Sequence, residues 1–286
     1  MVEPPKLRRR PSREQVYRRR LVALIVLALA LGGGGWAAWA AISSDEAAPE
    51  PTTTAAAPKQ VRITLPEGLT VSQMARAADA ASRRITTAGY LQAVRRQRLP
   101  ARFGAPKSPE GFLFPDTYFL FENDPAAVLV EKQLENFRAK WAKVDLRYAH
   151  SKNLTDYDVL IIASMIEKEV VVPRERPLVA AVIYNRLHSR MTLGIDATLR
   201  YGLDIPPTQA ITKRELASSS PYNTRRFHGL PPTPIANPGL ASIEAAAHPA
   251  KVDYLYFVRK PDCRSHFFTA SADAFLAYTR RGLTDC

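Results

Sequence analysis

The sequence predicts an α+β protein in which an N-terminal transmembrane helix precedes a small α+β module and a larger mixed α/β domain. Three patterns lead to this prediction: an uncharged apolar run at 21–42, an Ala-, Pro- and Thr-rich segment at 43–59, and mixed periodicity after residue 60. Strict alternation of apolar and polar residues indicates strands, and apolar spacing of three and four indicates helices. Both kinds of spacing occur after residue 60, so both kinds of element are expected there.

Residues 1–20 form a basic tail. The chain holds 40 Lys and Arg against 27 Asp and Glu, a formal net charge of +13, and eight of the basic residues lie in this tail. A basic run can bind nucleic acid. Here it precedes an apolar run, 21–42, which is long enough to cross a bilayer core of about 30 Å and ends with Trp36 and Trp39. Basic residues mark the cytoplasmic flank of a span and Trp marks its interface. We therefore expect a single-pass protein of the cytoplasmic membrane, with its N-terminus inside, its bulk outside and no nucleic-acid partner.

A cleaved signal peptide is the alternative for this apolar run. Ala38, Trp39 and Ala40 resemble a small-x-small cleavage site. Both alternatives export the rest of the chain. A lipoprotein anchor is excluded because no cysteine lies near the run.

The chain has two cysteines, Cys263 and Cys286. In an oxidising compartment they are able to pair, and the sequence leaves open whether they do. The five histidines show neither HExxH nor HxxxH spacing. We therefore expect no metal site and no cofactor.

Residues 43–59 are predicted to be a disordered linker. They contain almost no bulky side chain, so they cannot bury enough apolar surface to offset the entropy lost on ordering. An extended segment of this length, at about 3.1 Å per residue, reaches roughly 50 Å. That reach suits a substrate held away from the membrane.

Residues 60–122 are predicted to form the small module, in the order strand, helix, helix, strand. Val61, Ile63 and Leu65 alternate with polar residues, and a turn follows at 66–68. The expected elements are a strand at 61–65, helices at about 70–81 and 87–96, and a strand at 112–120 interrupted at Pro115.

Residues 123–286 are predicted to form the larger domain. Its first helix is expected to begin at Asp124 and Pro125, because an acidic cap before proline is a strong helix start. Its apolar face is predicted at Ala127, Val130, Leu134, Phe137 and Trp141. The other expected elements are a helix at 156–170 capped by Thr155 and Asp158, a helix after Pro173, a short helix capped by Thr212 and Glu215, a helix from Asn237 to Ala247, strands at 254–258 and 266–268, and a helix at 271–281.

Glu167 is the candidate catalytic residue. It lies near the end of an otherwise apolar helix, and helical geometry turns Glu169 about 200° away from it. One of the two is therefore expected to face the interior or a cleft. Apolar surroundings raise the pKa of a carboxyl and suit it to act as a general acid. On the residues alone, a solvated pair of glutamates at a helix end is the commoner arrangement.

Six polar residues in predicted loops or helix ends are candidates for substrate binding. Prolines stiffen part of this region, so less entropy is lost when it binds a long ligand, and tyrosine rings are able to stack on sugars. The six are Asn185, Asp196, Thr198, Tyr222, Asn223 and Thr224.

Nine short motifs together resemble the endolytic murein transglycosylase family, in the family's order from about residue 61 to 275. They are 65–68 (LPEG), 110–118 (EGFLFPDTY), 163–169 (ASMIEKE), 182–187 (VIYNRL), 191–193 (MTL), 196–198 (DAT), 220–224 (SPYNT), 229–235 (GLPPTPI) and 254–258 (YLYFV). Three positions depart from the family. Residues 194–198 read GIDAT where the family has Gln-x-Asp-Pro-Thr, so the Gln and the Pro are absent, and Arg225 stands where an aromatic residue is common.

The resemblance implies that Glu167 is the catalytic residue and that 60–122 is a LysM-like module. It implies a lytic transglycosylase that cleaves the MurNAc–GlcNAc bond of peptidoglycan, leaves 1,6-anhydro-MurNAc ends and limits glycan strand length during wall synthesis. Glycan strands, the cytoplasmic membrane and peptidoglycan synthases are then the expected partners. Two alternatives stay open: a hydrolytic muramidase in which Asp196 is the second carboxylate, and a non-catalytic, membrane-anchored peptidoglycan-binding protein.

Overall fold

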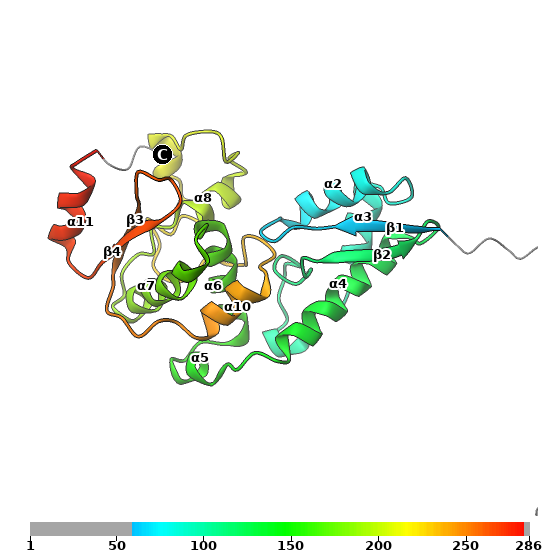
Figure 1. The fold of residues 1–286 in the computed structure, drawn as a ribbon, viewed down its shortest axis with the longest axis horizontal. Helices are drawn as coiled ribbons and strands as arrows, with labels where there is room; N and C mark the ends of the chain where they lie inside the picture. Colours follow the sequence, from blue (N-terminus) through cyan, green and yellow to red (C-terminus); the bar gives the residue numbers. More distant parts are fainter. Residues whose placement is uncertain (1–58, 283–286) are drawn as a thin grey trace, which may run out of the picture. The chain divides into compact units, whose positions relative to one another are not determined.

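The structure, a computed structural model, describes residues 59–282 (Figure 1). The described residues belong to one compact unit, Pro58–Cys286. The predicted basic tail, the predicted membrane span and all but the last residue of the predicted linker lie outside the described residues. Among residues 59–282, no helix combines the length and the hydropathy that crossing a membrane requires.

The described chain is α+β, as predicted. The elements are, in order, β1 (Gln60–Thr64), α2 (Val71–Ala81), α3 (Thr87–Arg95), the 3₁₀ helix η1 (Ala101–Phe103), β2 (Thr117–Phe121), α4 (Ala126–Trp141), α5 (Arg147–Ser151), α6 (Asp156–Glu169), the 3₁₀ helix η2 (Pro173–Glu175), α7 (Arg176–His188), α8 (Asp196–Leu203), α9 (Lys213–Leu216), α10 (Leu240–Ala247), β3 (Tyr256–Arg259), β4 (His266–Thr269) and α11 (Ala272–Thr279).

The first elements have the predicted order strand, helix, helix, strand. β1 and β2 pair antiparallel, with Ile63 opposite Tyr118. α2 packs on β1 and α3, and α4 packs on α3 and β2 (Figure 1). Thr70 caps α2 in a reciprocal box with Gln73, which satisfies two backbone amides at the helix start. The division of the chain at residues 122 and 123 stays a prediction.

The predicted strand at 112–120 is wrong in its first half. Only Thr117–Phe121 is a strand, because Pro115 has no amide to donate to a ladder. The amides before it bond elsewhere: that of Leu113 donates to Asn237 Oδ1 and that of Phe114 donates to the Gln133 carbonyl. Residues 112–114 are buried, so they belong to the hydrophobic core and not to the sheet.

α6 is the central helix of the second half. Thr155 and Asp158 form the predicted capping box at its start, and every residue from Val159 to Ile166 is buried. α7, α8 and α10 pack against it (Figure 1). Burying one large apolar side chain stabilises a fold by about 1.5–3 kcal/mol, so this run anchors α6 firmly. The residues that follow it, starting with Glu167, are thereby held in place.

Three boundaries differ from prediction. Asp196 begins α8 instead of lying in a loop. Pro125 is the N-cap of α4, because the Asp124 carboxylate accepts a hydrogen bond from the Phe121 amide. α10 begins at Leu240 rather than at Asn237, because the Asn237 amide and carbonyl bond to the chain near residue 68.

The C-terminal strands are confirmed as an antiparallel pair, β3 with β4, on which α11 packs (Figure 1). Between them, Cys263 is disulfide-bonded. The chain's other cysteine, Cys286, lies outside the described residues.

Candidate functional site

Glu167 occupies the last turn of α6, where the helix leaves the core. It is half-buried, unlike the fully buried residues just before it. Its Oε2 atom accepts a hydrogen bond from the Gly239 amide, with a donor–acceptor distance of 3.1 Å. Gly239 is the N-cap of α10, and a helix N-terminus presents amides and partial positive charge to an anion. The carboxylate is therefore oriented by a backbone donor and keeps one side open.

The turn after β1 forms a second wall of this site. Gly68 has φ +77°, and a Cβ added to it would lie 3.5 Å from Glu167 Cγ. The Lys168 ammonium donates to the Gly68 carbonyl at 3.1 Å. Because positive φ favours glycine, the turn passes close to Glu167 only with glycine at this position.

Glu67, in the same turn, brings a second carboxyl to the site. A Cβ added to Gly239 would lie 1.7 Å from Glu67 Oε1, so this carboxyl is seated directly against Gly239. Partial burial and the neighbouring Glu167 raise the pKa of Glu67, and Arg176 opposes the rise. Two carboxyls therefore meet at one glycine.

Asn237 joins the three segments that build the site. Its Oδ1 accepts from the amides of Gly111 and Leu113, both at 3.0 Å, and its Nδ2 donates to the Leu69 carbonyl and to Glu110 Oε1. Its own carbonyl accepts from the Gly68 amide. A single buried side chain therefore ties the β1–α2 turn and residues 110–113 to the segment that enters α10.

Glu110 is a buried carboxyl next to this junction. It accepts from the Val71 amide at 3.0 Å and from the Tyr201 hydroxyl at 3.3 Å. Burial raises its pKa to about 8, against the lowering effect of these hydrogen bonds, of Asn237 and of the Lys168 charge. A carboxyl with this pKa is largely protonated at neutral pH, and its contacts give it a structural place beside the site.

Glu169 lies away from Glu167, in agreement with the helical spacing. Burial and the nearby Asp196 raise its pKa, while Arg259, a hydrogen bond from the Ala197 backbone and Arg225 lower it. Its surroundings are thus the start of α8, whereas those of Glu167 are the start of α10 and the turn at 66–68. The two glutamates belong to different clusters.

Asp196 is the most exposed of the predicted binding residues around α8. Its Oδ1 accepts from Arg225 Nε at 2.6 Å, and about 44% of its side chain is exposed. Thr198 and Thr224 are buried nearby; their hydroxyls bond to each other at 2.9 Å and to the backbone of Ile195. In this structure the threonines hold the backbone that positions Asp196.

Tyr222 and Asn223 lie in the loop before the proline-rich segment. The Tyr222 hydroxyl bonds to the Thr233 hydroxyl at 2.8 Å, and its half-buried ring packs edge-on against Tyr201. Asn223 is fully buried, and its amide donates to the carbonyls of Leu216 and Ser218. These contacts shape the loop, and contact of either residue with a glycan stays a prediction.

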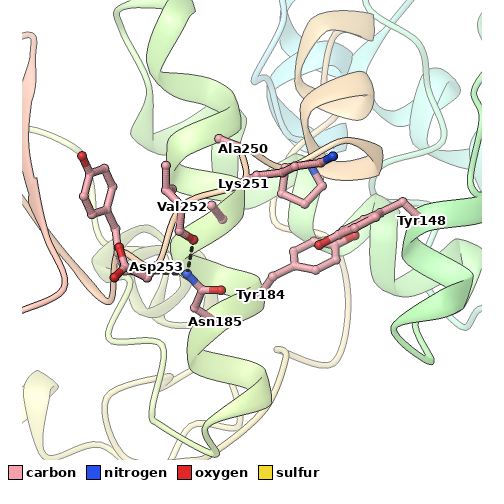
Figure 2. A pocket seen from close by; sticks show the side chains of 10 residues that line it. Tyr148, Tyr184, Asn185, Ala250, Lys251, Val252 and Asp253 are labelled. Atoms are coloured by element: carbon pink, nitrogen blue, oxygen red, sulfur yellow. Dashed lines mark hydrogen bonds between the residues drawn. The ribbon is translucent and has the colours of Figure 1, made fainter.

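Asn185 lines a cavity of about 570 Å³ whose lining includes none of the other predicted site residues. Its amide donates to the carbonyls of Val252 and Tyr254, both at 2.9 Å. Figure 2 shows this amide directed at the 250–254 segment, with Tyr148 and Tyr184 at the other side of the cavity. Asn185 therefore holds the chain leading to β3, and its role in substrate binding stays a prediction.

Three parts of the Glu167 cluster were not predicted from the sequence: Glu67, Gly239 and Arg176. The LPEG motif at 65–68 contains Glu67, but nothing local indicates that it meets a helix that begins more than 170 residues later. Asn237 was seen only as a helix start. Within residues 59–282, no group of three or more His, Cys, Asp or Glu side chains is arranged to hold a metal ion.

Comparison with known proteins gives consistent results. The sequence matches the model of the YceG-like family over residues 35–281. It is 36% identical over 151 residues to an endolytic murein transglycosylase of Bacillus subtilis (strain 168), covering 53% of this chain and 42% of that protein. It is 32% identical over 228 residues to an endolytic murein transglycosylase of Streptococcus pneumoniae (strain ATCC BAA-255 / R6), covering 70% and 41%. A crystal structure of a yceG-like protein from Listeria monocytogenes superposes with a TM-score of 0.68 at 29% identity, over 76% of each chain. The chain thus spans about two fifths of the length of the curated relatives it matches.

Proposed function

Because the chain belongs to the YceG-like family, we propose that it is an endolytic lytic transglycosylase of peptidoglycan. It cleaves the bond between MurNAc and GlcNAc inside glycan strands and leaves 1,6-anhydro-MurNAc ends, which limits strand length during wall synthesis. The relatives carry the name endolytic murein transglycosylase. The observation that carries the proposal is the position of Glu167, a half-open carboxyl oriented by the Gly239 amide.

One carboxyl is enough for this reaction. The Glu167 carboxyl gives its proton to the glycosidic oxygen, and the bond to C1 of MurNAc breaks as positive charge develops on C1. The C6 hydroxyl of the same MurNAc then forms a bond to C1. Its proton passes to the Glu167 carboxylate, which restores the acid. No water is consumed, and neither a metal nor a cofactor takes part in these steps.

Replacing Glu167 by Gln tests the role of this carboxyl. Gln keeps the size and is still able to accept from the Gly239 amide, but it cannot donate and recover the proton. Glycan cleavage is expected to fall by about 10²–10⁴-fold, with the thermal unfolding midpoint little changed. The measurement is the release of soluble fragments from purified peptidoglycan.

Glu169→Gln is the matched control. It makes the same chemical change two residues away and leaves an oxygen to accept the hydrogen bond from the Ala197 backbone. It is expected to retain most activity. A normal rate for Glu167→Gln combined with loss in Glu169→Gln would move the catalytic role to the α8 cluster.

A hydrolytic muramidase is the second candidate, because a further carboxyl near the acid would be able to activate water. The candidates for it are Asp196, which is partly exposed, and Glu67, which lies beside Glu167. Mass spectrometry of the digest separates the two reactions: 1,6-anhydro-MurNAc termini support the transglycosylase, and reducing MurNAc termini would replace it by the muramidase. A wild-type protein that binds strands without cutting them would leave only the role of a non-catalytic anchor.

We also propose the location and architecture that the sequence predicts. The chain spans the cytoplasmic membrane once through residues 21–42, with residues 1–20 inside and the enzyme outside, and residues 60–122 form a LysM-like module. The β1–α2–α3–β2 order, with antiparallel strands, supports the module.

Glycan strands are the proposed substrate and peptidoglycan synthases are the proposed partners. Protease added to spheroplasts should remove the chain after residue 47 and spare residues 1–20, whereas a shortened protein in the medium would favour a cleaved signal peptide.

A further inference from the structure

The cavity of about 570 Å³ that Asn185 lines lies outside the Glu167 cluster and has no role in the mechanism above. Its volume falls within the range of about 300–1,000 Å³ that is usual for small-molecule sites. We propose that it is a second saccharide-binding site, which holds sugar units of a glycan strand at a distance from the bond that Glu167 cleaves. This inference rests on the proposed function, because glycan strands are the proposed substrate.

Tyrosine side chains form much of the cavity wall. Tyr148 of α5, Tyr184 of α7 and Tyr254 before β3 all line it. The rings of Tyr148 and Tyr184 are neighbours, with centroids 6.0 Å apart and planes inclined at 35° (Figure 2). Tyr148 is 38% exposed, so part of its ring is open to a ligand. A tyrosine offers an apolar ring with a polar tip, which suits a sugar, whose apolar C–H faces are edged by hydroxyls.

The walls of the cavity are held by hydrogen bonds within the protein. The Tyr184 hydroxyl donates to the Ala246 carbonyl at 2.7 Å, which fixes this ring against α10. The Asn185 amide group donates to the carbonyls of Val252 and Tyr254, which fixes the opposite wall to α7. A site that is already ordered loses little entropy when it binds a ligand. The cavity is therefore formed by the fold itself.

Polar groups without a protein partner border the cavity. Both donors of the Asn185 amide group are used, but its Oδ1 atom has no hydrogen-bond partner among residues 59–282. Figure 2 shows this oxygen turned away from the 250–254 segment, towards Tyr184. Lys251 and Asp253 also line the cavity, are exposed and form no ion pair within the described residues. An acceptor, a cation and an anion are thus available to sugar hydroxyls and N-acetyl groups.

Two helices run from the Glu167 cluster to this cavity. α7 begins with Arg176 of the cluster and carries Asn185 of the cavity wall. α10 begins after Gly239, whose amide binds Glu167, and ends just before Pro249, which lines the cavity. At 1.5 Å per residue, these stretches of α7 and α10 are about 14 and 12 Å long. A glycan strand of a few sugars covers such a distance.

The exposed face of α10 connects the two places. Ala241, Glu244 and His248 are exposed, and their spacing of three and four residues puts them on one side of the helix. The first of them lies two residues after Gly239 and the last directly precedes Pro249. Nearest to Gly239, only the methyl group of Ala241 stands on this face. A strand bound at Glu167 is therefore able to follow α10 to the cavity.

A second contact on the same strand has a consequence for substrate choice. Once the first contact is made, the second becomes intramolecular and strengthens binding without a change at the catalytic residue. Strands long enough to reach both places are then bound more tightly than short fragments that reach only one. The cavity therefore favours cleavage of long strands, in agreement with endolytic action.

The test is the binding of glycan strands freed of their peptides to full-length Glu167→Gln, which is expected to hold strands without cutting them. Adding Tyr148→Ala should weaken binding by about 5- to 10-fold, the loss expected when an aromatic anchor is truncated. Tyr148→Phe keeps the ring and should bind like the parent. In the active enzyme, Tyr148→Ala should raise KM for long strands and leave kcat unchanged, because Tyr148 lies outside the Glu167 cluster.

Tyr278→Ala is the matched control. The Tyr278 ring stacks on Phe267, whereas Tyr254 of the cavity stacks on Phe268. Successive residues of a strand point to opposite faces, so Tyr278 and the cavity lie on opposite sides of β4. This variant should leave strand binding unchanged. Thermal unfolding of each variant monitors folding.

The outcomes separate the inference from the proposed function. Unchanged strand binding in a folded Tyr148→Ala variant overturns the inference and leaves the proposed function intact. A wild type that binds strands but does not cut them overturns the proposed function, while weaker binding in Tyr148→Ala would still support the saccharide site. If Lys251→Gln weakens the binding of peptide-bearing strands and Tyr148→Ala changes nothing, the cavity binds the peptide attached to MurNAc and the inference is wrong.

Discussion

Replacing Asn237 by Ala is expected to destabilise the protein by about 3–9 kcal/mol, although the side chain is small and polar. The reason is that four hydrogen bonds meet on it. The amides of Gly111 and Leu113 both donate to its Oδ1, and its Nδ2 donates to the Leu69 carbonyl and to Glu110. All four bonds span more than 120 residues of sequence, so they hold separate segments together.

The size of this change depends on which hydrogen bonds the four partners of Asn237 retain in the variant. Leu69 still accepts from the Asn237 amide and Glu110 still accepts from the Val71 amide, so each of these losses costs about 0.5–1.5 kcal/mol. The amides of Gly111 and Leu113 lose the acceptor they have in the structure and are buried; each orphaned donor costs about 1–3 kcal/mol. Since a domain is stable by about 5–15 kcal/mol, the change removes a large part of the total.

Urea unfolding of the compact unit that begins at Pro58, followed by circular dichroism, measures this change. Asn237→Asp separates hydrogen bonding from volume, because it keeps the acceptor but turns an oxygen towards Leu69 and Glu110; it should also destabilise. Asn136→Ala is the control. Its amide donates to Asp116 at the surface and, at 3.3 Å, to the Tyr118 hydroxyl, which still bonds to the Phe114 carbonyl in the variant, so stability should stay within about 1 kcal/mol of the wild type. If the stability of Asn237→Ala also stays within about 1 kcal/mol of the wild type, water replaces the lost hydrogen bonds and the expected destabilisation is refuted.

Three further predictions concern the same region and the chemistry. Gly111→Ala should lower the free energy of unfolding by about 1–3 kcal/mol, because Gly111 has φ +92° and a Cβ there would lie 2.8 Å from Pro234. An unchanged thermal unfolding midpoint would contradict this prediction. Burial raises the pKa of Glu110 from 4.5 to about 8, so the unfolded chain releases this proton at a lower pH than the folded chain does. Stability should therefore fall as pH rises from 4.5 to about 8, by up to about 1.4 kcal/mol per pH unit. Glu110→Gln should flatten this part of the plot of urea midpoint against pH, and a slope equal to that of the wild type would refute the assignment to Glu110. Glycan cleavage should survive EDTA, and loss of activity that Zn²⁺ restores would rule out the single-carboxyl mechanism.

Helix positions were predictable where the signal is local. The Thr155–Asp158 capping box and the apolar run after it predict the start and the buried course of α6. The Thr212–Glu215 box predicts the start of the short helix α9. These signals involve residues three or four apart, which meet in any helix that forms. Residues 112–114 misled the prediction because apolar runs suit a strand and a core loop equally, and only their hydrogen-bond partners decide between the two.

The sequence alone determined the family resemblance, the α+β class, the course of the helix that carries Glu167 and the separation of Glu167 from Glu169, because each depends on local spacing or on motif order. The tertiary structure alone decided what surrounds Glu167. Gly239 and Glu67 lie 72 and 100 residues from it, and they meet it only when α6, α10 and the β1–α2 turn pack together. Burial likewise decided that Thr198, Asn223 and Thr224 bond inside the protein. Contacts of this kind leave no periodic pattern in the chain, since they depend on which buried polar groups find one another when distant segments close on a common core.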